Sequence, residues 1–296
     1  MAIDTITKYA PMLDKVYEKG LLTGDLVPNS ILVQASNDAN AIKVAKVTSQ
    51  AMADYNKSTG YVAGTSGLTW ETHTFTQDRG RKLTVDNVDN METAGIAFGG
   101  IAADFINVHS IPEIDAYRFA TMFGKAGTTA SADLTKSTID EAIDDAGEVM
   151  DDANVPSESR VIYVSSKAYK LIKQSDLFSR TLIPGQNSNR NFGEYDNMKV
   201  IKVPKTRFYS KIDLYDGTTG GQEAGGYIKN AATGKDLNFM IVHPSSVIPV
   251  MKLNEPKTFK PEDNWDIDAY IFVMRVYHDM FVLDNKVDGI YAHTVA

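Results

Sequence analysis

Residues 68–86, LTWETHTFTQDRGRKLTVD, form the segment that most constrains how this chain can fold. Alternating threonine, aromatic and charged residues predict two β-strands, and Asp78-Arg79-Gly80 predicts the turn that joins them into a hairpin. Neither strand has an apolar face, because polar residues alternate on both sides. A hairpin of this kind is only marginally stable in water by itself. We therefore expect it to lie against a surface that it does not supply.

A long apolar stripe predicts a helix directly after this segment. Asp89 and Glu92 have the spacing of a capping box. The stripe consists of Ala94, Phe98, Ile101, Phe105 and Val108. Ser110 and Glu113 repeat the capping-box spacing, so we expect the helix to break or bend near Ser110 and to end near residue 123.

The remainder of the chain alternates between helical and strand patterns. Residues 1–62 resemble an extended arm, with a short helix between Pro11 and Gly20 and two strands at 30–35 and 41–47. A helix at 138–153 presents Ile139, Ile143, Ala146 and Met150 on one face. Strands are expected at 160–164, 199–203 and 236–243, with Ser165 or Ser166 capping a helix that ends near residue 174.

Two further stretches have clear signatures. Residues 216–226, DGTTGGQEAGG, are dense in glycine and predict a mobile loop. Residues 265–283 show a nearly continuous β pattern, in which Phe272, Met274, Val276, Met280 and Val282 share one face. A strand over 270–283 would be about 45 Å long, at about 3.3 Å per residue.

Composition excludes several classes of function. The chain has no cysteine, which removes disulfides, thiolate metal sites and cysteine nucleophiles. Its formal net charge of −8 gives no general attraction to nucleic acid or anionic membranes. The first residues do not form a signal peptide, and the most apolar helical run is too short to span a bilayer. The densest basic cluster, Arg79, Arg81 and Lys82, lies at the tip of the predicted hairpin.

Motifs that would indicate chemistry are weak. The glycine-rich stretches lack the spacing of phosphate-binding and dinucleotide-binding loops. His278 and Asp279 could form part of a metal site, but neighbours on a strand point to opposite faces. The acidic segment 140–152 is either a cation site or a solvated helix face, and we expect the solvated face. We therefore expect no catalytic, cofactor-binding or metal site.

Four segments together resemble the major capsid proteins of tailed phages, which share the Hong Kong 97-type capsid fold. They are ANAIKVAKV (39–47), DYNKSTGY (54–61), LTWETHTFTQDRGRKLTVDNVDNMET (68–93) and IPEIDAYRFATMF (111–123). The C-terminal half agrees with this order through DNMKVIKVPKTRF (196–208) and FMIVHPSSVIPVMKLNEPKTFKP (239–261). The resemblance therefore covers nearly the whole chain.

This resemblance implies an α+β fold with named parts. Residues 1–62 would be the N-terminal arm, and 63–88 the extended E-loop hairpin that lies over a neighbouring subunit. Residues 89–133 would be the peripheral domain with its long spine helix, 134–246 the axial domain, and 247–296 the long peripheral strands. The hairpin would then be stabilised by another subunit. The expected inter-subunit contact residues are Trp70, Phe75, Arg79, Arg81 and Lys82.

The resemblance also implies a structural role without enzyme activity or cofactor. The chain would assemble with itself into hexamers and pentamers of an icosahedral head shell around double-stranded DNA, with no membrane contact. Portal and decoration proteins and non-specific DNA contact are further expected partners, and scaffolding would be a separate protein or not used, since the arm begins almost at Met1. The protein would occur in the virion capsid and, before assembly, in the host cytoplasm. Lys82 and Asn264 match the residue types of a cross-link found in some relatives, although no motif supports the bond.

Two alternatives remain open at this stage. An encapsulin-like compartment shell shares the implied fold. A cytosolic α+β enzyme is a different class, and convergent polar residues in a deep pocket would favour it.

Overall fold

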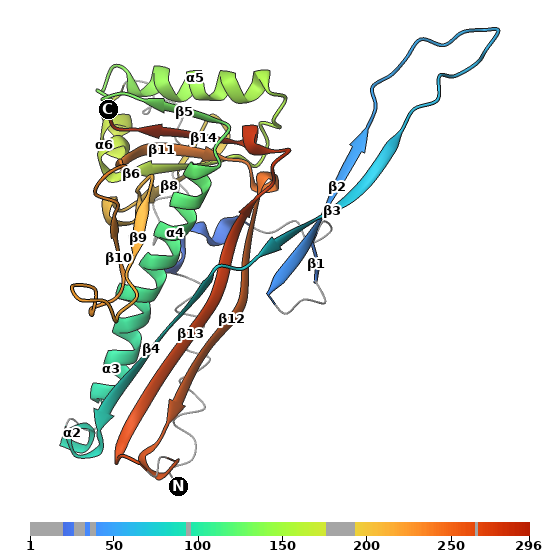
Figure 1. Cartoon of the computed structure of the whole chain (residues 1–296). Coiled ribbons are helices and arrows are strands. Elements are labelled where there is room, and N and C mark those ends of the chain that lie inside the picture. The colour runs from blue at the N-terminus through green and yellow to red at the C-terminus, as the bar shows by residue number, and fades with distance from the viewer. Residues whose placement is uncertain (1–19, 27–32, 36–39, 93–95, 176–192, 264–265) are drawn as a thin grey trace. The chain divides into compact units, whose positions relative to one another are not determined.

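The computed structural model describes residues 20–26, 33–35, 40–92, 96–175, 193–263 and 266–296 (Figure 1). The expected helix after Pro11 and the cross-link candidate Asn264 lie outside the described residues. The chain forms two compact units, one of residues 29–77 and one of residues 1–28 with 78–296.

A six-stranded mixed sheet forms the wide end of the larger unit (Figure 1). Its order is β5 (Thr128–Ser131), β14 (Ile290–Thr294), β11 (Leu237–Val242), β6 (Val161–Ser165), β8 (Met198–Val203) and β7 (Gly193–Tyr195). β14 runs parallel to β5 and β8 runs parallel to β6, whereas the other neighbours are antiparallel. This sheet thus joins strands from the expected axial domain to β14, which the expected division assigned to the peripheral domain.

Both faces of this sheet are buried. On β6, Tyr163 faces one hydrophobic core and Ile162 faces another. Helices α5 (Ile139–Asp152) and α6 (Ser166–Gln174) pack on the Ile162 side, and α4 (Ile111–Gly124) packs on the Tyr163 side. Burial on both sides explains why these strands read as short apolar runs in the sequence.

The sequence predictions for this sheet and its helices are confirmed. The predicted face of α5 is at most 1% exposed at Ile139, Ile143, Ala146 and Met150. The hydroxyl of Ser165 accepts a hydrogen bond from the backbone N–H of Ala168 (3.1 Å) and caps α6. The expected strands at 160–164, 199–203 and 236–243 correspond to β6, β8 and β11.

The glycine-rich loop is closed by hydrogen bonds within the loop and at its base. It connects β9 (Ile212–Leu214) to β10 (Tyr227–Lys229), which pair with each other. The backbone N–H of Tyr215 donates to the carbonyl of Gly226 (2.9 Å) and closes the loop at its base. Asp216 accepts from the N–H groups of Thr218 and Thr219 (2.8 Å each). The loop is therefore a hydrogen-bonded turn that is closed at its base.

A three-stranded sheet of long strands extends from this end. Its order is β12 (Val247–Phe259), β13 (Ala269–Val282) and β4 (Gln77–Asp86). The predicted long strand is confirmed as the 14-residue β13, and its predicted apolar face is buried throughout. Phe272 and Val276 pack in a core with the helices beside this sheet, whereas Met280 and Val282 pack in the core of the six-stranded sheet. β13 therefore connects the two cores.

The helical segment beside these strands widens instead of breaking. It consists of α2 (Asn87–Glu92), α3 (Ile96–Asp104), the π-helical η3 (Phe105–Ser110) and α4. The N–H of Ile111 donates to the carbonyl of Ile106, five residues back, which is π-helical bonding. Ser110 has helical backbone angles and does not cap α4 with its side chain. The helix is therefore not broken at Ser110, and the irregularity near this residue, where the sequence predicts a break or a bend, is a π-helical turn.

The side chains that face the core along this helical segment differ from the predicted stripe. Ala102 and Ile106 are buried beside Phe98 and Phe105. Ile101 and Val108, which the sequence placed on the apolar stripe, are 41% and 55% exposed. The predicted stripe is therefore only partly correct.

The N-terminal segment of the larger unit is held on α4 by a buried carboxylate. The short helix η1 (Leu22–Asp25) supplies the N–H groups of Leu22 and Thr23 and the hydroxyl of Thr23, all of which donate to Asp115 (3.1, 3.2 and 2.9 Å). Arg207 pairs with the same carboxylate (3.2 Å). Short 3₁₀ turns complete the unit at η4 (Lys205–Arg207), η5 (Pro244–Ser246), η6 (Pro261–Asp263) and η7 (Val287–Gly289).

The smaller unit is a three-stranded antiparallel sheet with the order β1 (Val33–Ala35), β2 (Ala41–Ser49) and β3 (Ser66–Thr74). β2 and β3 pair from Ala41–Thr74 to Ser49–Ser66. The predicted hairpin between residues 68 and 86 is therefore wrong, because β3 pairs with β2 and β4 pairs with β13. The hairpin that exists begins at Ala41, before the expected E-loop boundary at residue 63.

Candidate assembly surfaces

The β2–β3 hairpin carries large apolar side chains on its surface. The exposed ones are Val47, Met52, Tyr55, Tyr61, Val62, Leu68 and Trp70. Tyr61 is 90% exposed and contacts Tyr55 edge to face, with ring centroids 4.9 Å apart. Large exposed apolar side chains that gather on one hairpin indicate a site of interaction with another molecule. The hairpin therefore has the character of a contact surface.

Two of the predicted contact residues near the hairpin lie in different environments. Trp70 lies opposite Ala45 in the β2–β3 ladder and is 47% exposed. Phe75 is only 8% exposed, and its backbone N–H donates to the carbonyl of Asn40 (2.9 Å). Trp70 is therefore available to another subunit, whereas Phe75 is buried within the chain.

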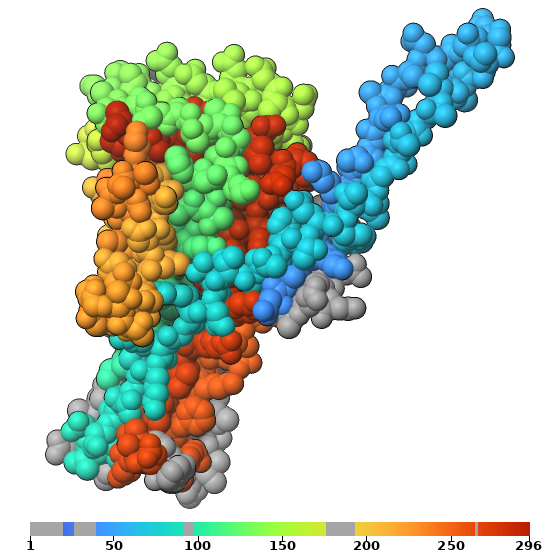
Figure 2. Space-filling model, in the orientation of Figure 1, coloured from blue at the N-terminus to red at the C-terminus, as the bar shows by residue number. Residues whose placement is uncertain are grey.

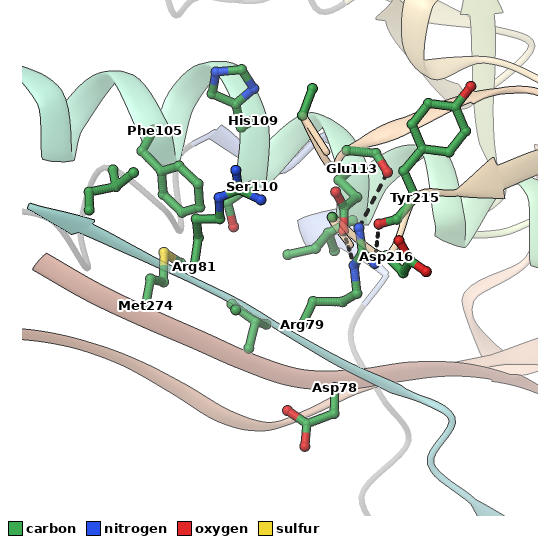
Figure 3. Close-up of a pocket in the computed structure, with 18 of the residues that line it drawn as sticks. Asp78, Arg79, Arg81, Phe105, His109, Ser110, Glu113, Tyr215, Asp216 and Met274 are labelled. Carbon is green, nitrogen blue, oxygen red and sulfur yellow. Dashed lines mark hydrogen bonds and ion pairs between the residues drawn. The ribbon is translucent and has the colours of Figure 1, made fainter. Parts of the chain in front are cut away.

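The basic cluster does not lie at a hairpin tip. Arg79, Arg81 and Lys82 are on β4, and the alternation of a strand places Arg79 and Arg81 on the opposite face from Lys82. Figure 3 shows Arg79 and Arg81 extending toward the helices and Asp78 pointing away from them. The sequence reading of one concentrated positive patch is therefore wrong.

Gly80 explains why the turn was predicted in the wrong place. A Cβ atom at this position would lie 2.8 Å from the carbonyl oxygen of Met274 on β13. The position thus requires glycine because two backbones approach closely, and not because the chain turns. The sequence Asp-Arg-Gly is typical of a turn, but in β4 its glycine allows this strand to pack closely on β13.

Arg79 is held by three groups of its own subunit. Its Nε donates to Oε1 of Glu113 (2.6 Å), and its Nη1 and Nη2 donate to the carbonyl oxygens of Tyr215 (2.8 Å) and Gly226 (3.3 Å). The Arg79 and Glu113 side chains are only 25% and 14% exposed. The charge that was predicted to meet a neighbour is therefore neutralised inside the chain (Figure 3).

The sequence did not reveal this arrangement. Glu113 was read as part of a capping box, but its carboxylate pairs with Arg79. Tyr215 and Gly226 contribute backbone carbonyls, which carry no residue-type signal. On the opposite face of β4, Asp78 accepts from Nε (2.8 Å) and Nη2 of Arg275, so a second ion pair joins β4 to β13. The Arg275 guanidinium hydrogen-bonded to Asp78 holds the pKa of that carboxyl below its usual value.

Groups that could carry chemistry are used structurally. Among the described residues, no three or more His, Cys, Asp or Glu side chains are grouped so that they could hold a metal ion. His278 and Asp279 are both buried, and the hydroxyl of Tyr117 donates to Asp279 (2.7 Å). The acids of α5 are largely exposed, as expected for a solvated face. Burial raises the pKa of Asp144 among them, although the Tyr195 hydroxyl donates a hydrogen bond to it. None of the described helices is both long and apolar enough to cross a membrane.

Comparison with solved structures decides the fold. A chain of Gordonia phage Cozz is similar over 94% of this chain and 86% of that chain, with 12% identity and a TM-score of 0.61. A chain of the capsid of the cyanophage P-SCSP1u is similar over 92% and 87%, with 13% identity and a TM-score of 0.58. This chain has the Hong Kong 97-type capsid fold.

The Hong Kong 97-type fold confirms the α+β class and the resemblance that the sequence indicated. A virus-like particle from Pyrococcus furiosus is also similar, over 97% of this chain and 98% of that chain, with 10% identity and a TM-score of 0.55. Comparison with protein-family models and with curated protein sequences gives no match. The fold is therefore recognised through structure, at a level where sequence identity is low.

Proposed function

We propose that this chain is a major capsid protein that assembles with copies of itself into the hexamers and pentamers of an icosahedral head shell. The shell encloses the double-stranded DNA of a tailed phage or prophage. The fold supports this role, since similar chains form the capsid of the cyanophage P-SCSP1u and the mature capsid of bacteriophage PhiM1. The observation that carries the proposal is the β2–β3 hairpin, which exposes apolar side chains over most of its length.

The parts of the chain are assigned to shell roles as follows. The β2–β3 hairpin with its connecting loop, residues 41–74, serves as the E-loop that lies over a neighbouring subunit. The helices from α3 to α4, with β4, β12 and β13, form the peripheral domain, and the six-stranded sheet with α5 and α6 forms the axial domain. Residues before 41 serve as the arm.

The structure changes which residues we assign to contacts between subunits. Trp70 and Lys82 are exposed and remain the residues that we assign to contacts between subunits. Phe75 is buried, and Arg79 and Arg81 are directed toward the helices of their own chain. The main chain and exposed apolar side chains of the hairpin then provide most of the contact surface.

Further partners follow from the shell role. A scaffolding protein, a portal, a decoration protein and the packaged DNA would contact the shell, and DNA contact would be weak and non-specific because the chain is acidic. The protein would be found in virion capsids and, before assembly, in the host cytoplasm. No enzyme activity is assigned to it.

A compartment shell is the second candidate, because the virus-like particle from Pyrococcus furiosus matches over nearly its whole length. An enzyme would need a nucleophile next to a base among the polar residues of the cavity described below. Ser110, which lines this cavity, forms no hydrogen bond to a histidine within the described residues. The carboxylate of Glu113, which also lines it, is paired with Arg79. An enzyme is therefore disfavoured.

Negative-stain electron microscopy of the purified full chain tests the proposal. We expect closed shells or free hexamers and pentamers. Monodisperse monomers at all protein concentrations would favour the enzyme instead. If shells form, the contents of particles purified from the native source separate the two shell candidates. Particles that contain protein cargo and lack DNA-packaging proteins would favour the compartment.

A further inference from the structure

A cavity of about 350 Å³ lies in the larger unit between β4, η3, the start of α4 and the glycine-rich loop (Figure 3). One part of its lining is apolar and consists of Leu83, Phe105, Ile114, Met274 and Val276. Another part is polar and includes Arg79, Arg81, His109, Ser110, Glu113 and Asp216. Its size and mixed lining are those of a site for a small amphipathic molecule.

The carboxylates around the cavity are already engaged. Glu113 pairs with Arg79, and Asp78 pairs with Arg275. Asp216 accepts from the Thr219 hydroxyl (2.6 Å) and from two backbone N–H groups, which hold its pKa below the usual value. The charges of Glu113 and Asp78 are therefore balanced by arginines, whereas Asp216 stays ionised and directs its oxygens to donors of its own loop.

Arg81 is the cation of the cavity with unused donors. Within the described part of the chain it forms no ion pair, and its hydrogen bond runs from Nη2 to the carbonyl oxygen of Glu223 (3.2 Å). A guanidinium has five N–H donors in a planar arrangement that matches a carboxylate. Most of the Arg81 donors thus remain available.

The glycine-rich loop lies next to this guanidinium. A Cβ atom at Gly217 would lie 3.0 Å from Nη1 of Arg81, and one at Gly225 would lie 3.4 Å from it. Both glycines have positive φ values (76° and 69°), which other residues rarely adopt. The loop backbone therefore passes close to the guanidinium, and its Glu223 carbonyl accepts a hydrogen bond from it.

The wall of the cavity supplies one more polar atom. His278 lines the cavity and is 2% exposed, and its Nδ1 forms no hydrogen bond within the described residues. Buried polar side-chain atoms in proteins usually have a hydrogen-bond partner. Nδ1 of His278 is therefore an acceptor or donor that a bound molecule could use.

We propose that this cavity, here called the Arg81 pocket, binds a small carboxylic acid anion with an apolar body. The Arg81 guanidinium holds the carboxylate, and Leu83, Phe105 and Met274 contact the apolar body. All lining residues belong to one subunit, so this proposal does not depend on shell assembly.

Isothermal titration calorimetry of the unassembled subunit tests ligand binding in the Arg81 pocket, with phenylacetate as the probe. Acetate has the carboxylate without the ring, and benzyl alcohol has the ring without the carboxylate. We expect phenylacetate to bind at least about tenfold more tightly than acetate or benzyl alcohol. Acetate cannot make the apolar contacts, and benzyl alcohol cannot pair with the Arg81 guanidinium. Equal binding of phenylacetate and benzyl alcohol, or no binding of phenylacetate, would overturn the proposal.

A matched pair of variants locates the site. Arg81→Ala should weaken phenylacetate binding about tenfold or more, whereas Lys82→Ala removes the same charge from the opposite face of β4 and should leave binding unchanged. Circular dichroism checks that both variants fold. With ¹⁵N-labelled histidine, phenylacetate should shift the imidazole signal of His278 and leave His243 and His293 unchanged. An equal loss in both variants, or no shift at His278, would contradict the site.

Discussion

Nε of Arg79 lies 2.6 Å from Oε1 of Glu113, and the two side chains join β4 to the first turn of α4. The same guanidinium donates to two carbonyl oxygens of the glycine-rich loop. One residue thereby connects three elements that are separated by 34 and by more than 130 residues of sequence. The ion pair stabilises the subunit itself.

Replacing Arg79 by alanine should destabilise the isolated subunit. The change leaves Glu113 without its counter-charge in a largely buried position and removes donors from two carbonyls. We expect a loss of about 1–3 kcal/mol in the free energy of unfolding, measured by urea denaturation. Lys82→Ala, on the other face of the same strand, should change it by less than about 0.5 kcal/mol. Equal stability of the two variants would mean that the Arg79 pair contributes nothing.

A methyl group at Gly80 should also destabilise the subunit. In Gly80→Ala the added Cβ would lie 2.8 Å from the Met274 carbonyl, so β4 and β13 must separate locally. The expected cost is about 1–3 kcal/mol, again from urea denaturation. Gly220→Ala is the matched control, because that position has open space around it and no positive φ. A neutral Gly80→Ala would indicate that the two strands are not closely packed.

Lowering the pH should reduce the free energy of unfolding of the subunit, because His278 is buried. Burial, with a further contribution from Arg118, lowers the pKa of His278 from 6.5 to about 4. Between these values the unfolded chain binds a proton that the folded chain excludes, so stability falls as the pH drops from about 6.5 toward 4. The full effect is about 3 kcal/mol. His278→Gln should flatten the dependence of stability on pH in this window, as followed by urea denaturation at several pH values. An unchanged slope would show that His278 is not responsible.

Elements with a local signal were predictable from the sequence. The α5 face could be read from Ile139, Ile143, Ala146 and Met150, because a one-sided apolar stripe on a helix has only one way to be buried. The long strand β13 could be read from its period of two, and the cap of α6 from Ser165. The fold class followed from the resemblance of other segments, at 39–47, 54–61, 68–93 and 111–123, to tailed-phage capsid proteins.

Elements that depend on distant partners were not predictable. The polar strands β3 and β4 have no residue pattern that identifies the strand with which each one pairs. Gly80 suggested a turn, although the glycine is needed for close packing of β4 on β13. The π-helical turn at Phe105–Ser110 has no sequence signature, and Ile101 and Val108 of the predicted stripe lie off the core face. Arg79 and Glu113 each had a plausible local role, so their pairing could be found only in three dimensions.

The hairpin allows the most direct test of the shell-forming role. Ser49 and Ser66 lie opposite each other at the end of the β2–β3 ladder, so residues 50–65 can be replaced by Asn-Gly, which favours a tight two-residue turn. The replacement removes Met52, Tyr55, Tyr61 and Val62, all exposed, and leaves the larger unit unchanged.

Sedimentation velocity of the parent chain and this hairpin variant, with electron microscopy of the peak fractions, is the deciding measurement. We expect the parent to form shells or hexamers and pentamers, and the variant to remain a folded monomer with the parent's unfolding midpoint. Assembly of the variant to the same particles as the parent, or a parent chain that stays monomeric, would contradict the account.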